Sequence, residues 1–215
     1  PGEVMSYRVL LIMSALNRKW GSMRLRSLDQ WIHQWEMPEM YAGAGKQGAE
    51  DAWYQTMIDL ELLQLEGTAY CGGTADIMKF VDQILRPLVY QLLKVAGMPE
   101  PILDAYRRFQ EGLIVHNSLA GSIGHAYRRP CSIPQGCPLS MMIVAVMMRP
   151  WIMIMKENGL QPKVLADDVL VISQGKNMLG RLARGLHSPH ISLQAIGANV
   201  APTRRIKSDS TTPDS

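Results

Sequence analysis

The sequence predicts an α+β fold in which helices pack behind a small antiparallel β-sheet. Two segments indicate the sheet: a short strand pattern spans 70–76, and apolar runs flank a pair of acids within 163–172, which is typical of a tight β-hairpin. Apolar residues recur at helical spacing over much of the remaining chain. Of the 215 residues, 47% are hydrophobic and 19% are charged, so the chain has enough apolar side chains for a sizeable core.

The expected elements follow in order along the chain. Helical spacing predicts helices over 9–35, 48–66, 79–96, 101–110, 138–148 and 176–186. Short apolar stretches bounded by turn residues predict strands over 70–76, 113–119, 125–133 and 191–196, in addition to the acidic hairpin. Pro87 marks a kink or a junction inside 79–96. The loop 42–48 is rich in glycine but lacks the spacing of a phosphate-binding loop.

Charge and cysteine content narrow the class of protein. The net charge of +3 is mildly basic and compatible with a polyanionic partner. The three cysteines have no metal-binding spacing, and reduced thiols in an intracellular protein are the simplest interpretation: Cys71, Cys131 and Cys137. No signal peptide is visible, and the most apolar window, 139–155, is interrupted by Arg149 and Pro150. This window predicts a buried helix, and we expect no membrane contact.

Three aspartates are the candidate catalytic and metal-binding residues. Asp76 ends the strand pattern of 70–76, while Asp167 and Asp168 lie at the tip of the predicted hairpin. Adjacent carboxylates repel each other and are costly to bury without a partner, so a bound cation is expected there. If the strands are neighbours, all three carboxylates meet at one sheet edge and suit Mg²⁺ or Mn²⁺. Two such ions support phosphoryl transfer. The alternative is a solvated hairpin tip.

Three blocks add context to these acids. They are ADIMKFVD at 75–82, SIPQGCPLS at 132–140 and LADD at 165–168. In this order and spacing they resemble motifs of the reverse transcriptases of non-LTR retrotransposons and group II introns. The second block is the most specific, since it is close to the S-I-P-Q-G-x-P-L-S motif of that family. The third matches the [YF]-A-D-D box apart from its first residue.

Weaker similarity extends the resemblance over roughly 7–205. Residues 7–11 and the loop 43–48 resemble two fingers segments, and 197–200 with Arg204 resembles the motif after the palm hairpin. The resemblance implies a polymerase right-hand fold without a thumb. Its expected parts are fingers-like 1–69, palm-like 70–202 with the fingers partly interleaved, and a polar tail, 203–215, expected to be disordered.

The resemblance implies an RNA-directed DNA polymerase, a nucleotidyltransferase that joins a dNTP to a primer 3′-hydroxyl. Its expected cofactors are two Mg²⁺ or Mn²⁺ ions, and its expected partners are an RNA template and a DNA primer. Asp76 and Asp167 would hold the metals, with help from the main-chain carbonyl of Ile77. Asp168 would be the second acid of the box, closer to the primer end. The family suggests a nuclear location.

The resemblance also assigns residues to the nucleotide and the template. Gln135 and Gly136 would lie against the template and the incoming base, since glycine allows a close backbone approach. Arg8 would contact the triphosphate through its guanidinium fork, and an exposed arginine is the alternative. Arg204 would lie near the leaving pyrophosphate, although arginine is a poor proton donor. Val81 would lie under the sugar.

The sequence departs from the family at three of these positions. Val81 stands where an aromatic residue usually excludes a 2′-hydroxyl, so weaker discrimination against ribonucleotides is expected. Leu165 replaces the aromatic residue of the box, and Arg204 replaces a lysine. Two alternatives therefore stay open: a degenerate remnant that binds nucleic acid, and an RNA-copying palm polymerase.

Several further side chains have structural or electrostatic interpretations. Trp20, Trp31 and Trp35 fit a core stripe better than a base-stacking platform. His187 and His190 are not expected to bind a metal, because a proline separates them and no acid or cysteine lies nearby. As a set, eight basic residues are expected to contact template or primer: Arg18, Lys19, Arg24, Arg26, Arg107, Arg108, Arg128 and Arg129.

Overall fold

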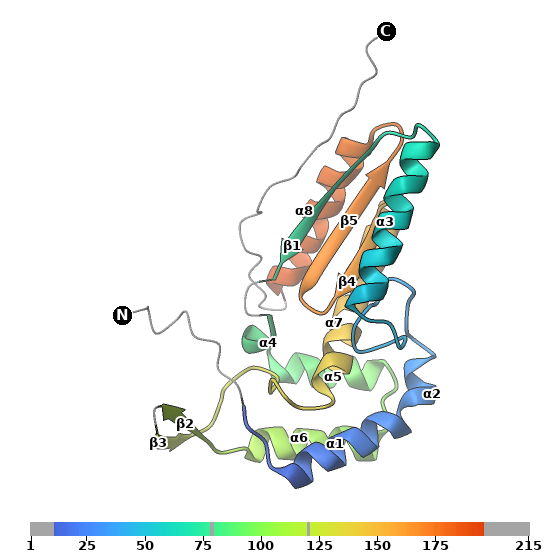
Figure 1. Cartoon of the computed structure of the whole chain (residues 1–215). Coiled ribbons are helices and arrows are strands. Elements are labelled where there is room, and N and C mark those ends of the chain that lie inside the picture. The colour runs from blue at the N-terminus through green and yellow to red at the C-terminus, as the bar shows by residue number, and fades with distance from the viewer. Residues whose placement is uncertain (1–10, 78–79, 120, 196–215) are drawn as a thin grey trace.

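The computed structural model describes residues 11–77, 80–119 and 121–195, apart from the side chains of Asp76 and of 188–195. Its helices are α1 (Ala15–Ser27), α2 (Asp29–Ile32), α3 (Ala49–Leu65), α4 (Phe80–Gln83), α5 (Arg86–Val95), α6 (Glu100–Gly112), α7 (Ser140–Glu157) and α8 (Met178–Ala195) (Figure 1). Its strands are β1 (Tyr70–Asp76), β2 (Val115–Leu119), β3 (Ser122–Tyr127), β4 (Gln161–Leu165) and β5 (Asp168–Gln174). The predicted mixture of helices and small antiparallel sheets is confirmed.

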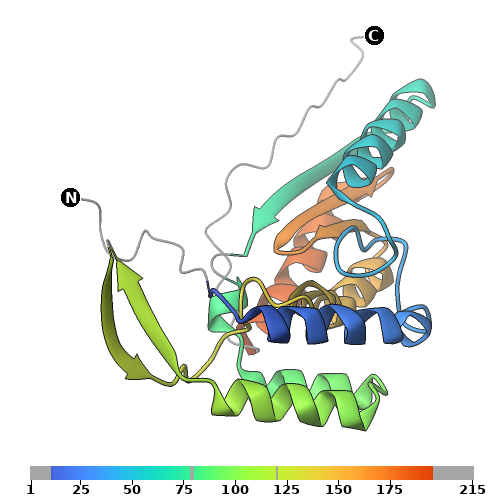
Figure 2. The same ribbon diagram turned by 60° about the horizontal axis from the view of Figure 1, so that its bottom comes forward.

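Three strands form the main sheet in the order β1-β5-β4, and both pairs are antiparallel. The register runs from Tyr70 opposite Gln174 to Asp76 opposite Asp168. Helices α7 and α8 pack on this sheet, and α3 lies along β4 (Figure 1). Strands β2 and β3 form a separate exposed hairpin that projects from the rest of the molecule (Figure 2).

Helix α7 is the centre of the hydrophobic core. Eleven of its 18 residues are buried, including Met148 and Ile152, which are fully enclosed. Burying apolar side chains all around a helix compensates for the backbone hydrogen bond that Pro150 cannot make. The guanidinium group of Arg149 is hydrogen-bonded within the protein: its Nε donates to the carbonyl oxygen of Trp35 at 3.1 Å. The prediction of a buried helix is confirmed, but its expected end at residue 148 is wrong, since it continues to Glu157.

Other expected helix boundaries also differ from the structure. The segment 9–35 is divided into α1 and α2, and residues 11–14 precede the helix. α1 begins where the Ser14 hydroxyl accepts a hydrogen bond from the Asn17 backbone at 3.2 Å. Pro87 lies in the first turn of α5, so it marks the junction with α4, because proline suits the start of a helix.

Further differences concern the strand expected over 125–133, which begins earlier, at Ser122, and the helix expected over 176–186, which continues to Ala195. β3 ends at Tyr127, and the segment after it is irregular, because its backbone groups pair with α4 and its surroundings. Residues 191–195 belong to α8 and form no strand, because the helix continues through Pro189. Position 196 and the tail 203–215 lie outside the described residues. Within the described part of the chain, no helix is both long enough and apolar enough to span a membrane.

Candidate active site

The acidic hairpin turns over two residues, Ala166 and Asp167, between β4 and β5. Ala166 has a φ of 60° and Asp167 has no positive φ, which is the pattern of a type II′ hairpin turn. A non-glycine residue in this conformation costs on the order of 1 kcal/mol, so the surrounding structure must hold it in place. The predicted hairpin is confirmed, with Asp167 in the turn and Asp168 as the first residue of β5.

The sheet brings the backbones of the three candidate acids to one end. Asp76 is the last residue of β1, and its register partner is Asp168. The backbone N–H of Ile77 donates to the carbonyl oxygen of Asp167 at 3.2 Å, which ties the end of β1 to the turn. Antiparallel pairing therefore places residues that are about 90 positions apart in the sequence at the same sheet edge.

A cavity of about 430 Å³ opens beside this edge. Its lining includes Asp167 from the turn, Val81 from α4, and Gln135 and Gly136 from the segment before α7. Each of the three sequence blocks thus contributes to one cavity. The other lining residues are Phe80, Asp82, Cys137, Pro138, Ser140, Met141, Val144 and Ala166.

Backbone hydrogen bonds hold the 132–140 wall of the cavity against α4. The N–H of Ser132 donates to the carbonyl oxygen of Ile84 at 2.8 Å, and the N–H of Ile133 donates to that of Val81 at 3.0 Å. The Ser140 hydroxyl donates to the carbonyl oxygen of Pro134 at 2.7 Å, which closes the segment on itself. The wall is therefore fixed at both ends by short bonds within the protein.

A buried arginine supports the same wall from behind. Arg86 Nη2 donates to the carbonyl oxygen of Arg129 at 2.7 Å, and Arg86 Nε donates to the Glu111 carboxylate at 3.0 Å. Burial alone would raise the pKa of Glu111, but hydrogen bonds from Tyr90 and Arg86 and the positive charge of Arg86 outweigh it and lower that pKa. Arg129 in turn pairs with Asp82 at 3.4 Å and donates to the Ser132 hydroxyl.

The glycine-rich loop also reaches the cavity wall. Gly43 has a φ of 76°, and a Cβ built on it would lie 2.0 Å from the carbonyl oxygen of Met141. Only a glycine fits this close approach between two backbones. Since Met141 is in the first turn of α7 and lines the cavity, the loop sets the position of that turn.

Cys137 and Asp167 are the cysteine and the turn acid of the cavity. Cys137 is buried, and burial raises the pKa of its thiol, so it lines the cavity as a neutral thiol rather than as a nucleophile. Asp167 is half-buried, and no described lysine or arginine forms an ion pair with it. In the part of the chain that the structure describes, no group of three or more His, Cys, Asp or Glu side chains is placed to hold a metal. The Asp76 side chain lies outside that part.

The structure brings together most of the site residues predicted from the sequence. Arg8 and Arg204 lie outside the described residues. Sequence reasoning missed Asp82, Met141 and Val144 as lining residues. Asp82 stands in the first block, and the spacing of Met141 and Val144, three residues apart on α7, was a signal for one shared helix face.

Comparisons with solved structures find telomerase chains. Telomerase from Candida albicans in complex with the TWJ fragment of telomeric RNA has a TM-score of 0.60 and 13% sequence identity, over 92% of this chain and 36% of that chain. Apo telomerase from Candida tropicalis, truncated from its C-terminal domain, has a TM-score of 0.57 and 14% identity, over 86% of this chain and 38% of that chain. No protein-family model and no curated protein matches this chain.

At such low identity, the likeness shows the fold alone. The chain has a reverse-transcriptase-like fold of the kind found in telomerase, and it spans little more than a third of the length of the solved chains it matches. The comparison supports this broad class and does not single out the retrotransposon and group II intron type that the sequence blocks resemble.

Proposed function

We propose that this chain carries the nucleotide-adding centre of an RNA-directed DNA polymerase of the retrotransposon type. The observation that supports it best is the cavity of about 430 Å³, which joins residues of all three blocks beside the acidic turn. In the proposed reaction, a primer 3′-oxygen forms a bond to the α-phosphorus of a dNTP. The bond from that phosphorus to the bridging oxygen breaks, and pyrophosphate leaves.

The acids at the sheet edge fit divalent metal ions. Asp76 and Asp168 are register partners, and the adjacent Asp167 is half-buried without an ion-pair partner among the described residues. Carboxylate oxygens are the ligands that Mg²⁺ and Mn²⁺ prefer. Asp76 and Asp167 would hold two such ions, with Asp168 and the Ile77 carbonyl beside them. When bound, the ions would supply charge stabilisation at the attacking and leaving oxygens.

The chain's own side chains would select and orient the nucleotide. Val81 lies in the cavity with Asp167, so it is placed to sense the sugar next to the acids. Gln135 and Gly136 line the same cavity, and the amide of Gln135 offers both a donor and an acceptor for a base. The buried backbone contacts of 132–140 would keep this wall from moving when the nucleotide enters.

RNA binding is supported by the comparison. The Candida albicans telomerase with a similar fold was solved with a fragment of telomeric RNA. The blocks in this chain resemble enzymes that copy RNA into DNA. We therefore propose an RNA template, a DNA primer and dNTP as the partners of this site.

Primer extension on an RNA template tests the proposal. The assay would use a 5′-labelled DNA primer, dNTPs and Mg²⁺, with the chain and its Asp167→Asn variant at equal concentration. Extension by the unaltered chain that disappears in the variant would support the proposal. Circular dichroism would show that both proteins are folded. A folded chain that extends no primer with either Mg²⁺ or Mn²⁺ would contradict it.

Sugar selection is tested at Val81. We expect the chain to incorporate rNTPs more readily than its Val81→Phe variant, because the larger ring would occupy the space near a 2′-hydroxyl. The measurement is the ratio of kcat/KM for dNTP over rNTP in each protein. An equal ratio in both proteins would show that Val81 does not act as the sugar gate.

A further inference from the structure

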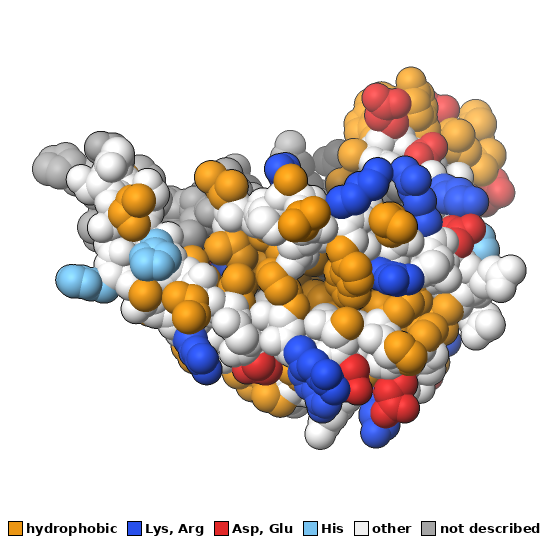
Figure 3. Space-filling view, turned by 90° about the horizontal axis from the view of Figure 1, so that it is seen from below, with side chains coloured by type: hydrophobic (Ala, Val, Ile, Leu, Met, Phe, Trp, Pro, Cys, Tyr) orange, Lys and Arg blue, Asp and Glu red, His pale blue; other side chains and the backbone are white. Residues whose placement is uncertain are grey.

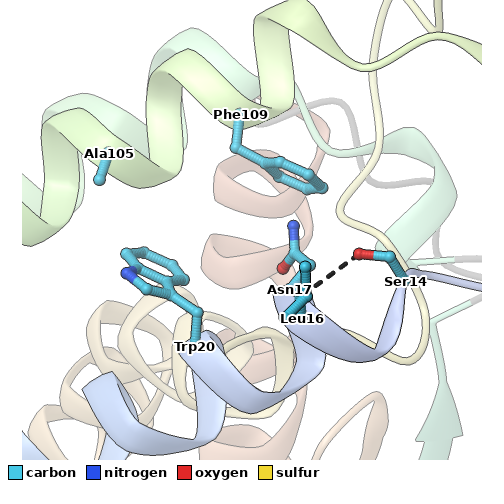
Figure 4. A pocket seen from close by; sticks show the side chains of 6 residues that line it. All are labelled: Ser14, Leu16, Asn17, Trp20, Ala105 and Phe109. Atoms are coloured by element: carbon cyan, nitrogen blue, oxygen red, sulfur yellow. Dashed lines mark hydrogen bonds between the residues drawn. The ribbon is translucent and has the colours of Figure 1, made fainter.

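A second cavity lies between α1 and α6, away from the acidic turn. It has a volume of about 370 Å³, within the range of ligand pockets, and shares no lining residue with the candidate active site. Ser14, Leu16, Asn17 and Trp20 line it from α1, and Ala105 and Phe109 from α6 (Figure 4). Trp31 and Trp35 are buried in the core, and Trp20 and Phe109 are partly buried and pack against it, so each of these two rings has one side in the core and is only partly covered.

Two aromatic rings face this space from opposite helices. Trp20 and Phe109 are both half-buried and point into the gap between α1 and α6 (Figure 4). Ring pairs among the described residues are Trp31–Trp35, Trp53–Tyr54 and Tyr90–Tyr106, so Trp20 and Phe109 are not stacked on each other. The cavity therefore leaves the faces of the two rings available to a flat guest, such as a nucleobase.

A polar group lies beside the rings. The side chain of Asn17 extends from α1 toward Phe109 (Figure 4). Its backbone N–H is held by the Ser14 hydroxyl at 3.2 Å, which fixes the first turn of α1. The Asn17 amide offers donors and an acceptor, the groups that recognise the edge of a base.

The charge of α1, the helix on one side of the cavity, favours a polyanion. α1 has no acidic residue over its 13 residues and carries four exposed basic ones: Arg18, Lys19, Arg24 and Arg26. None of the four forms an ion pair with a described residue. Figure 3 shows hydrophobic side chains gathered in a depression on this side of the molecule, with Lys and Arg side chains near its margins. α6 is more balanced, since Arg107 pairs with Asp104 at 2.8 Å.

We propose that this cavity is a binding site for one unstacked base of a single-stranded nucleic acid, whose phosphates lie along the basic residues of α1. A duplex keeps its bases stacked and paired, so the site would take a single strand. An apolar peptide helix is the other class of occupant for such a cavity. The arginines of α1, which have no ion-pair partner among the described residues, would not favour it. The proposal extends the nucleic-acid contacts of the proposed function to a second site, and it requires neither metal nor nucleotide addition.

Oligonucleotide binding in EDTA tests the site apart from polymerase activity. The probes are a fluorescein-labelled single-stranded RNA, an abasic oligonucleotide of equal length, and a duplex, each followed by fluorescence anisotropy. Trp20→Leu removes one ring, and Trp53→Leu makes the same change at an exposed position on α3, a helix without Lys or Arg. Trp20→Phe keeps a ring, so it separates stacking from folding.

We expect Trp20→Leu to weaken binding of the base-bearing single strand by about 5- to 150-fold, the range for one lost base–aromatic stack. Trp53→Leu and Trp20→Phe should bind within about twofold of the unaltered chain, because each keeps a ring in the cavity. The unaltered chain should prefer the base-bearing strand over the abasic one, and Trp20→Leu should lose that preference. Arg24→Gln should make the slope of log K against log salt shallower by roughly 1, the change expected when one phosphate contact is lost.

The proposal fails if the unaltered chain binds abasic and base-bearing strands equally. It also fails if Trp20→Leu binds as tightly as the unaltered chain, or weakens binding only as much as Trp53→Leu does. Should Trp20→Leu not fold, the comparison of abasic and base-bearing strands with the unaltered chain still decides. Since the assay contains no free divalent metal, its failure would leave the primer-extension result for the proposed function unaffected.

Discussion

Replacing Gly43 by alanine tests whether the glycine-rich loop positions the candidate active site. The new Cβ would lie 2.0 Å from the carbonyl oxygen of Met141, whereas real Cβ atoms essentially never come closer than 3.0 Å, so one backbone must move by about 1 Å. A left-handed conformation costs alanine about 1–2 kcal/mol, and overpacking adds about 1–3 kcal/mol. We expect a total loss of about 2–5 kcal/mol from the free energy of unfolding.

Gly67→Ala is the matched control. Gly67 has a φ of 64°, and nothing lies within 4 Å of a Cβ built on it. This variant carries only the conformational cost of about 1–2 kcal/mol. The difference between the two variants therefore isolates the close approach of Gly43 to α7.

Urea unfolding monitored by circular dichroism measures both losses, provided that the m values agree. Because Met141 lines the candidate active site, Gly43→Ala should also raise the KM for dNTP in primer extension, and Gly67→Ala should not. Equal stability losses in the two variants would refute the argument, since the contact with Met141 would then contribute nothing.

Three further predictions concern ionic contacts around the site. Arg86→Met should lower the free energy of unfolding by about 1–3 kcal/mol, because the carbonyl of Arg129 and the Glu111 carboxylate lose their donor; a change below about 0.5 kcal/mol in urea unfolding would contradict this. The folded state lowers the pKa of Glu111 from its ordinary value of 4.5, so its contribution is present above that value and is lost as the pH falls through the folded pKa. Glu111→Gln should therefore flatten the stability profile below pH 4.5, and an unchanged acid limb would count against the Arg86 contact. Lys163 is buried and pairs with Asp59 at 2.6 Å, so Lys163→Met should cost about 1–3 kcal/mol, whereas Lys156→Met, at a more exposed pair with Glu39, should cost at most about 1 kcal/mol. Equal effects at the two lysines in thermal unfolding would show that burial does not set the difference.

Local patterns were sufficient to predict the acidic hairpin and β1. The bounds of β1 agree with the prediction: the short segment ends at Asp76, and its partner strand β5 is strongly apolar. Helix ends were harder to predict. The usual effect of proline predicts that α7 ends near Pro150 and that α8 ends before Pro189, yet both helices continue past these residues. In α7, burial against the sheet and α8 outweighs one lost backbone bond, a tertiary effect that the local sequence does not contain.

The candidate site could be predicted only as separate pieces. Asp167, Gln135 and Val81 were found from their own blocks, but the sequence gives no distance between blocks. Asp82 and Met141 line the cavity because α4 and α7 both border it, and Gly43 matters because its loop reaches α7. Spacing indicates that Met141 and Val144 share one face of α7, but only long-range packing determines that this face lines the cavity, so the local sequence could not place it there.

Backbone strain at the site shows how the fold holds it. Ala166 and Ser132 have φ values of 60° and 87°, and they lie in the two segments that meet across the cavity. Each strained segment is bonded to the region after β1: Ile77 donates to Asp167, and Ser132 donates to Ile84. These bonds join backbone atoms, so they do not depend on which side chain fills position 81 or 165. Under the proposed function, the departures at Val81 and Leu165 should therefore change which nucleotide fits, while the cavity itself persists.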